Sequence, residues 1–268
     1  MRATVGIFDS GVGGLSVAEV LHRLAPTLPI HYLADTAYFP YGERSAAEIE
    51  GRAVEIVRRL IAEGANAVVV ACNTATSAAL ERLRAEFTVP IVGMEPPVKP
   101  AVERSRSRRV LVLATPGTVA GARLARLTET HGGDAEVFTA PMPGLADLVE
   151  AGEIDGPRVE AALRGALAEP LARGVDEVAL GCTHYGFLRP SLRRLLPPHV
   201  ELLDAAEPVA RRTLHVIAEA GREIDLAVPE REVLCYATGD VAAFEATLER
   251  LRAGGAALPP LRVSRPVA

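Results

Sequence analysis

The 268-residue sequence has very few lysines, side-chain amides and cysteines. It contains no glutamine, two asparagines and a single lysine. That lysine, Lys99, lies in the proline-rich stretch 96–100, which is a poor setting for the Schiff-base lysine of a pyridoxal phosphate enzyme. We therefore expect no such cofactor. Because asparagine is scarce, Asn73, which directly follows Cys72, indicates a position where a side-chain amide is needed.

Long apolar runs and a concentration of basic charge are also missing. No run approaches the roughly 18 apolar residues of a membrane span, and an aspartate soon interrupts the short apolar stretch at the amino terminus, unlike a signal peptide. The formal net charge is −5, and we interpret the one basic cluster, residues 104–109, as a solvated turn. Nucleic-acid binding requires a concentrated basic surface. We expect a cytoplasmic protein with no membrane or nucleic-acid partner.

Three cysteines are too few for a disulfide framework, so their thiols are available for chemistry or packing. Two of them end similar apolar, β-branched runs, Cys72 after residues 67–71 and Cys182 after residues 177–181. Such runs predict strands buried on both faces of a parallel α/β sheet, whose carboxyl ends bind ligands. The polar residues that follow each cysteine predict a helix start, near Ser77 in the first case and near Phe187 in the second, and a helix start favours an anion. Cys235 lies inside a strand without a repeated context, and we interpret it as packing.

The chain is long enough for two α/β domains, and it shows signs of internal duplication. Val110 follows Val5 by 105 positions, Val137 follows His31 by 106, and Cys182 follows Cys72 by 110. Successive strand–helix elements thus recur at nearly one interval, as expected for a repeated unit. We expect a first domain over residues 1–95, a boundary in the proline-rich stretch 95–100 and a second domain over residues 96–209. The segment 210–268 is expected to pack back on the first domain.

Two loops at strand ends are candidates for ligand binding. The glycine-rich turn at residues 9–16 lies between a strand and a helix, but it does not match GxGxxG, which disfavours a nucleotide role. The loop at residues 35–45 is rich in aromatic residues and proline, which predicts that it folds over a site.

Two facing thiols can invert a stereocentre without a cofactor. A helix N-terminus or a nearby cation lowers the pKa of a thiol, so one cysteine can be the base while the other is the acid. On opposite sides of a carbon that bears an acidic hydrogen, one thiol removes a proton and the other returns one. Asp9 and His184 are the candidates to orient them. A zinc site of Cys72, Cys182 and His184 is a weaker alternative because no CxxC pair supports it.

Four motifs resemble those of the glutamate racemases, within the cofactor-independent aspartate/glutamate racemase superfamily, in order and spacing. They are residues 9–15 (DSGVGGL), 40–42 (PYG), 72–76 (CNTAT) and 181–185 (GCTHY), and the resemblance extends to residues 237–240 (ATGD). It implies two similar α/β domains with mostly parallel sheets and the active site in the cleft between them. It also implies interconversion of L- and D-glutamate, with no cofactor or metal, to supply D-glutamate for peptidoglycan.

The resemblance further implies residue roles. Cys72 would act on the D enantiomer and Cys182 on the L enantiomer, while Asp9, His184 and Glu150 assist. The substrate would be held by Asp9, Ser10, Tyr41, Gly42, Asn73, Thr74, Thr183 and His184. The position of Glu150 depends on the alignment of the loop at residues 140–150, where Ala140 replaces a cysteine found in many members.

Three further points follow from the resemblance or remain open beside it. The family commonly forms dimers, so we expect a homodimer. Within catalysis, the alternative is a racemase of aspartate or another amino acid. Outside catalysis, the alternative is a small-molecule-binding module in which the thiols only line a pocket.

Overall fold

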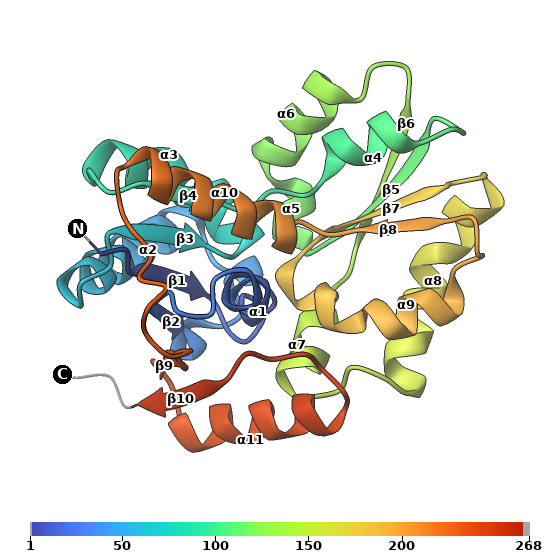
Figure 1. The fold of residues 1–268 in the computed structure, drawn as a ribbon. Helices are drawn as coiled ribbons and strands as arrows, with labels where there is room; N and C mark the ends of the chain where they lie inside the picture. The colour runs from blue at the N-terminus through green and yellow to red at the C-terminus, as the bar shows by residue number, and fades with distance from the viewer. Residues whose placement is uncertain (1, 265–268) are drawn as a thin grey trace.

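The computed structural model describes residues 2–264 as two parallel β-sheets with helices on both faces of each (Figure 1). The first sheet has the strand order β10-β9-β2-β1-β3-β4 and the second has the order β6-β5-β7-β8. The order β2-β1-β3-β4 therefore recurs as β6-β5-β7-β8, as the sequence intervals predicted. The α/β class with parallel sheets is confirmed.

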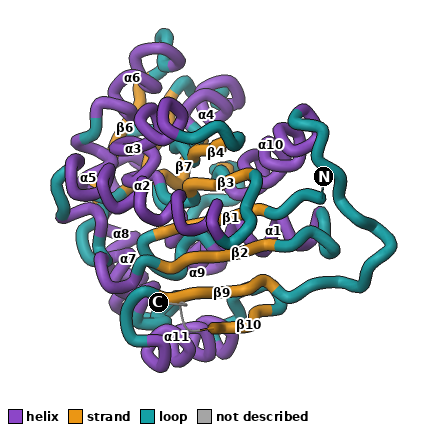
Figure 2. Tube along the Cα trace, turned by 90° about the vertical axis from the view of Figure 1, so that its left-hand side faces the viewer, coloured by secondary structure: helices purple, strands orange, loops and turns teal. Residues whose placement is uncertain are grey.

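The first sheet combines strands from both ends of the chain. Its strands are β1 (Val5–Asp9), β2 (Ile30–Ala34), β3 (Ala67–Val70), β4 (Ile91–Gly93), β9 (Val233–Ala237) and β10 (Leu261–Ser264). Every pairing in it is parallel; Val5 of β1, for example, pairs with Ile30 of β2 on one side and Ala67 of β3 on the other. The six strands follow one another from β4 to β10 in Figure 2.

Helices cover both faces of the first sheet because alternate strand residues point to opposite sides. They are α1 (Leu15–Leu24), α2 (Ala46–Ala62), α3 (Asn73–Glu86), α10 (Ala206–Glu219) and α11 (Val241–Ala253). In β3, Val68 and Val70 belong to the core formed with α2 and α3, whereas Ala67 and Val69 belong to the core formed with α1. β3 is thus buried on both faces, as its sequence predicted.

The second sheet has the same layered arrangement. Its strands are β5 (Arg109–Ala114), β6 (Glu136–Pro141), β7 (Glu177–Gly181) and β8 (Glu201–Leu203), and its helices are α4 (Val98–Arg104), α5 (Pro116–Ala120), α6 (Ala122–His131), α7 (Leu145–Glu150), α8 (Pro157–Ala172) and α9 (Arg189–Leu195). Figure 1 shows α4 and α6 over one face and α8 and α9 over the other.

Some predicted boundaries were wrong. Helix α3 begins at Asn73 instead of Ser77, because Cys72 caps its first turn. The proline-rich stretch 95–100 is not all linker, since α4 begins at Val98; proline is tolerated in a first helical turn, where the missing N–H has no partner anyway.

Two elements differ from the sequence interpretation in kind. Cys182 is followed by a 3₁₀ helix, Thr183–Leu188, where we expected a turn leading into a helix from Phe187. Strand β10 was not predicted, because its four residues show no clear apolar run.

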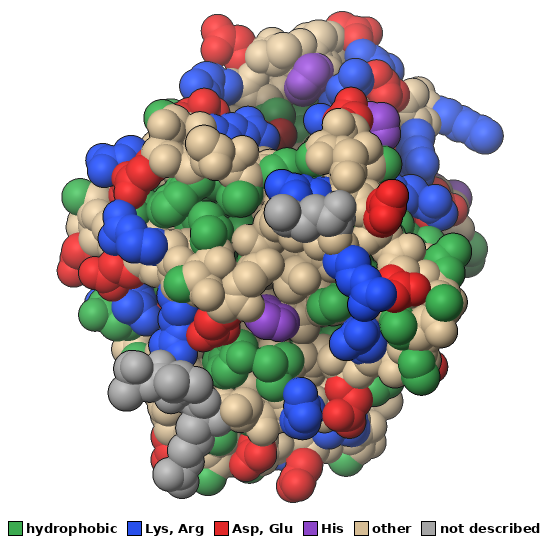
Figure 3. Space-filling view, turned by 60° about the vertical axis from the view of Figure 1, so that its left-hand side comes forward, with side chains coloured by type: hydrophobic (Ala, Val, Ile, Leu, Met, Phe, Trp, Pro, Cys, Tyr) green, Lys and Arg blue, Asp and Glu red, His purple; other side chains and the backbone are tan. Residues whose placement is uncertain are grey.

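The surface carries charges of both signs. On the face in Figure 3, basic and acidic side chains are interspersed. Within residues 2–264, no helix combines the length and the apolar character needed to cross a bilayer.

Candidate active site

A cavity of about 110 Å³ is lined mainly by residues that lie beyond the carboxyl ends of strands of both sheets. Of the predicted site residues, Ser10, Tyr41, Gly42, Cys72, Asn73, Thr74, Cys182, Thr183 and His184 line it. The first six come from the unit that contains β1 to β4, and the last three follow β7. The two cysteines therefore contact one cavity from two separate units of the fold.

Cys72 is the N-cap residue of α3. It follows the buried strand β3, and its Sγ accepts a hydrogen bond from the N–H of Ala75 at 3.5 Å. Burial raises the pKa of the Cys72 thiol strongly, and the nearby Asp9 raises it further, while the N–H of Ala75 lowers it. Burial thus favours the protonated thiol at Cys72.

Cys182 belongs to a chain of contacts that runs through His184 to Glu150. Its Sγ lies 3.7 Å from Nδ1 of His184, and the opposite ring nitrogen, Nε2, lies 2.6 Å from Oε1 of Glu150. Burial by itself lowers the pKa of His184, but the contacts with Cys182 and Glu150, helped by Asp9, raise it well above its usual value. A cationic ring beside the sulfur stabilises negative charge on it. The Cys182 side is therefore suited to hold a thiolate.

Asp9 and Glu150 do not line the cavity; they lie behind residues that do. Asp9 accepts hydrogen bonds from the Thr183 hydroxyl at 3.0 Å and from the N–H of Gly11 at 2.9 Å. Complete burial raises the pKa of Asp9, and the facing His184 opposes that rise. The carboxylate of Glu150 also accepts a hydrogen bond from the N–H of Val12 at 2.6 Å. Both acids thus orient the Thr183–His184 segment.

Comparison with known proteins decides the family. The model of the Asp/Glu/hydantoin racemase family matches residues 13–213. The chain is 43% identical over 251 residues to the glutamate racemase of Ectopseudomonas mendocina, covering 93% of this chain and 95% of that one. It is 46% identical over 217 residues to that of Pseudomonas aeruginosa, covering 81% and 82%. The chain belongs to the Asp/Glu/hydantoin racemase family.

A solved structure of the same family supports the fold. Escherichia coli glutamate racemase, crystallised with L-glutamate and the activator UDP-MurNAc-Ala, superposes with a TM-score of 0.85 at 31% identity. The match covers 100% of this chain and 99% of the E. coli chain. The two-domain architecture implied by the sequence resemblance is thus confirmed.

The glycines in residues 9–15, one of the motifs shared with the racemase family, leave room for the side chains of Asp9, Glu150 and His184. A Cβ on Gly11 would lie 1.8 Å from Oε1 of Glu150, and one on Gly13 would lie 2.5 Å from Nδ1 of His184. A Cβ at either position would force the Glu150 carboxylate or the His184 ring to move, so glycine allows the turn to approach the Glu150–His184 pair. This packing explains the glycines without a nucleotide.

A buried carboxylate fixes the loop that covers the racemase-family cavity. Asp35, at the start of the loop, is fully buried. Its carboxylate accepts hydrogen bonds from the hydroxyl of Tyr41 at 2.6 Å and from the hydroxyl of Thr238 at 2.8 Å. Arg52 of α2 donates to both of its oxygens, at 2.9 and 2.8 Å. Burial and the neighbouring Asp35 raise the pKa of Tyr41, which keeps it a donor. The loop is therefore anchored at Tyr41, beside Gly42.

Asn73 has a free acceptor inside the site. It is buried, its Nδ2 is 3.5 Å from the carbonyl of Met94, and its Oδ1 has no hydrogen-bond partner within residues 2–264. A buried polar atom without a partner is costly unless a ligand satisfies it. Asn73 is thus suited to contact a polar ligand group.

Sequence reasoning missed lining residues from the second unit, among them Thr115, Thr118 and Met142. The hydroxyl of Thr74 lies 3.3 Å from the hydroxyls of both Thr115 and Thr118, so these contacts join the two units. The available signal was the repeat itself, because Thr115 follows β5 as Ser10 follows β1.

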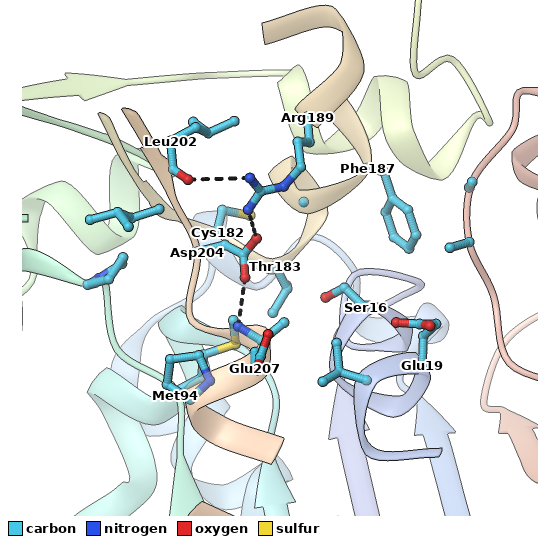
Figure 4. A pocket seen from close by; sticks show the side chains of 18 of the residues that line it. Ser16, Glu19, Met94, Cys182, Thr183, Phe187, Arg189, Leu202, Asp204 and Glu207 are labelled. Atoms are coloured by element: carbon cyan, nitrogen blue, oxygen red, sulfur yellow. Dashed lines mark hydrogen bonds and ion pairs between the residues drawn. The ribbon is translucent and has the colours of Figure 1, made fainter. Parts of the chain in front are cut away.

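A larger cavity of about 780 Å³ lies on another side of Cys182 (Figure 4). Of the predicted site residues, only Cys182 and Thr183 line it. Its charged side chains are partly paired with one another, as in the contact of Arg189 with Asp204. We place the chemistry in the smaller cavity, because both thiols and the hydroxyl and amide groups meet there.

The zinc alternative finds no support in the described part of the chain. No group of three or more His, Cys, Asp or Glu side chains within residues 2–264 is arranged to hold a metal ion.

Proposed function

We propose that this protein interconverts L- and D-glutamate by proton transfer at the α-carbon between Cys72 and Cys182. The observation that carries the proposal is that both thiols line one cavity from opposite units. Membership of the racemase family and the named glutamate racemases that align over most of the chain support glutamate as the substrate.

The two cysteines are prepared for different roles. His184 is cationic because its pKa is raised, and it lies against Cys182, which favours a thiolate that removes the α-proton of L-glutamate. Cys72 is a protonated thiol that returns a proton to the other face and yields D-glutamate. In the reverse direction Cys72 acts on the D enantiomer. Its thiolate is then favoured by the N–H of Ala75 and by the substrate's ammonium group.

The polar lining would hold the substrate. Candidate contacts are Ser10, Tyr41, Gly42, Asn73, Thr74, Thr183 and His184. Hydroxyl and backbone N–H donors neutralise carboxylate charge, which makes the α-hydrogen more acidic, while Oδ1 of Asn73 can accept from the ammonium group. Asp9 and Glu150 would act through Thr183 and His184.

The remaining expectations belong to the same proposal. D-glutamate would supply peptidoglycan synthesis in the cytoplasm, no cofactor would be required, and the protein would form a homodimer. The domains would be residues 1–95 together with 210–268, and residues 96–209. Strands β9 and β10, which extend the first sheet, support this division.

The test is incubation of L-glutamate with the purified protein and no added cofactor, followed by chiral chromatography. We expect a racemic mixture from wild type and none from Cys72→Ser or Cys182→Ser. L-Aspartate and other L-amino acids are run in parallel. Racemisation of one of these alone would replace glutamate as the substrate, and ligand binding without any racemisation would favour a binding module.

A further inference from the structure

Helix α11 contacts the segment that carries Glu150. The hydroxyl of Thr247 donates to the backbone carbonyl of Glu150 at 2.8 Å, and Nε of Arg250 donates to the carbonyl of Ala151 at 2.7 Å. Nη2 of Arg250 also donates to the Thr247 hydroxyl at 2.9 Å. The two side chains thus form one connected set of hydrogen bonds on the end of α7.

These bonds satisfy groups that α7 cannot satisfy itself. The last carbonyls of a helix have no partner within the helix, and side-chain donors from elsewhere can take their place. Helix α7 ends at Glu150, whose carbonyl accepts from Thr247 of α11, and the carbonyl of the C-cap residue Ala151 accepts from Arg250. Thr247 is buried, so its bond to the Glu150 carbonyl is shielded from competing water.

The backbone after α7 is shaped to admit Arg250. Gly152 has a φ of 79°, and a Cβ built on it would lie 2.4 Å from Cβ of Arg250. No other residue type fits both the left-handed backbone and the close approach. The close contact between α11 and the end of α7 therefore depends on glycine at position 152. In Figure 1, α11 lies beside β10 and extends toward α7.

The backbone of Glu150 is held from one side while its side chain acts on the other. Its Oε1 accepts a hydrogen bond from the N–H of Val12 at 2.6 Å and lies 2.6 Å from Nε2 of His184. A shift of the end of α7 would lengthen both contacts. Thr247 and Arg250 on α11 thus influence the position of the His184 ring through Glu150, although they contact neither the ring nor the cavity.

We propose that Thr247 and Arg250 are positioning residues that hold Glu150 against His184, so that α11 sets the orientation of the acid–base group beside Cys182. The expected effect on turnover rests on the proposed racemase function, whereas the positioning of Glu150 against His184 does not. The titratable groups that face His184 are Glu150 from α7, Asp9 from β1 and Cys182 from its own segment.

The kinetic test compares two substitutions at one position. Thr247→Val keeps the shape but removes the hydroxyl, whereas Thr247→Ser keeps the hydroxyl and removes a methyl group. We expect Thr247→Val to lower kcat about fivefold with KM little changed, the size that loss of one hydrogen bond can produce, and Thr247→Ser to retain most of the activity. The reverse order would mean that Thr247 only packs, and would overturn the proposal.

A double-mutant cycle tests whether Thr247 acts through Glu150. In a Glu150→Gln background, Thr247→Val should cause little further loss, because the group that it positions is already impaired. Additive losses would contradict the proposal. Arg252→Met on the same helix, at an exposed position, is the matched control for Arg250→Met, and only the latter should lower kcat.

A measurement without turnover separates this inference from the proposed function. The ¹⁵N signals of the His184 ring, assigned with a His184→Asn variant, report its titration whether or not the protein racemises glutamate. We expect Thr247→Val to lower the pKa of His184 and Thr247→Ser to leave it close to wild type. An unchanged pKa in Thr247→Val would overturn the inference even if wild type is active. A lowered pKa with an inactive wild type would support the inference and contradict the function.

Discussion

The substitution Glu150→Gln tests the electrostatic account of the Cys182 side. In the folded protein one oxygen of Glu150, Oε1, contacts both the N–H of Val12 and Nε2 of His184 at 2.6 Å. Glutamine offers an oxygen of the same shape at that position, so both contacts can persist. What is lost is the negative charge beside the imidazolium.

The size of the effect follows from the kind of bond that changes. A hydrogen bond to a charged group contributes about 1.5–3 kcal/mol and a neutral one about 0.5–1.5 kcal/mol. The difference, about 1–1.5 kcal/mol, corresponds to a fall of about one unit in the pKa of His184. The alkaline limb of the pH profile of kcat/KM should move down with it.

The same change alters stability in a defined pH range. The pKa of His184 is raised in the folded state, so its stabilising contribution is complete below the unfolded value and is lost as the pH rises through the folded value. Glu150→Gln should therefore be less stable than wild type mainly at acidic to neutral pH. Titration of the His184 ¹⁵N signals and urea unfolding at several pH values measure both effects. A pKa of His184 equal to that of wild type would refute the reasoning.

Three further substitutions test other parts of the structure. Gly11→Ala places a Cβ 1.8 Å from Oε1 of Glu150 and should lower kcat at least about tenfold, or ~1.4 kcal/mol, with an unchanged circular dichroism spectrum. Arg52→Met leaves the buried carboxylate of Asp35 without its cation and should lower the free energy of unfolding by about 3 kcal/mol in urea. Asp9→Asn should raise the unfolding midpoint at pH 7 while it lowers activity. Burial raises the pKa of Asp9 in the folded state above its unfolded value. The contribution of Asp9 to stability is therefore present at low pH, where the carboxyl is protonated, and is lost as the pH rises through the folded pKa. Asparagine avoids this loss.

Each of these predictions has a control or a contrary result. A Cβ on Gly51 of α2 would meet no atom of the described residues within 4 Å beyond its own stretch of helix, so Gly51→Ala should preserve activity. Arg58, also on α2, forms an ion pair with Glu86 at the surface, and Arg58→Met should cost no more than about 1 kcal/mol. A loss as large as that of Arg52→Met would contradict the importance of burial. A less stable Asp9→Asn protein at pH 7, or a stability gain that persists near pH 4, would contradict the linkage argument.

The sequence predicted what is local or repeated. Buried runs before Cys72 and Cys182 identified the strands, and parallel pairing brings such strand ends to one edge of a sheet. Polar residues after each cysteine identified much of the cavity lining. The helix start at Asn73 was misplaced because a cysteine side chain, an unusual cap, begins α3.

Contacts between distant segments could not be predicted in the same way. The carboxylate of Glu150 meets Val12 across 138 positions, and the backbone of Glu150 meets Thr247 across 97. Such contacts depend on how two packed units lie against each other, and no periodicity or local spacing encodes them. The short strand β10 was missed for a related reason, since it gains its place by pairing with β9.

The central claim is that two thiols act on opposite faces of one carbon. The most direct measurement is the isotope content of both enantiomers during early conversion of L-glutamate in D₂O. The account predicts that newly formed D-glutamate carries deuterium at the α-carbon while the remaining L-glutamate keeps its protium, because the base that removes the proton is not the acid that returns one. D-Glutamate that retains the substrate's own α-proton would point to a single base and contradict the account.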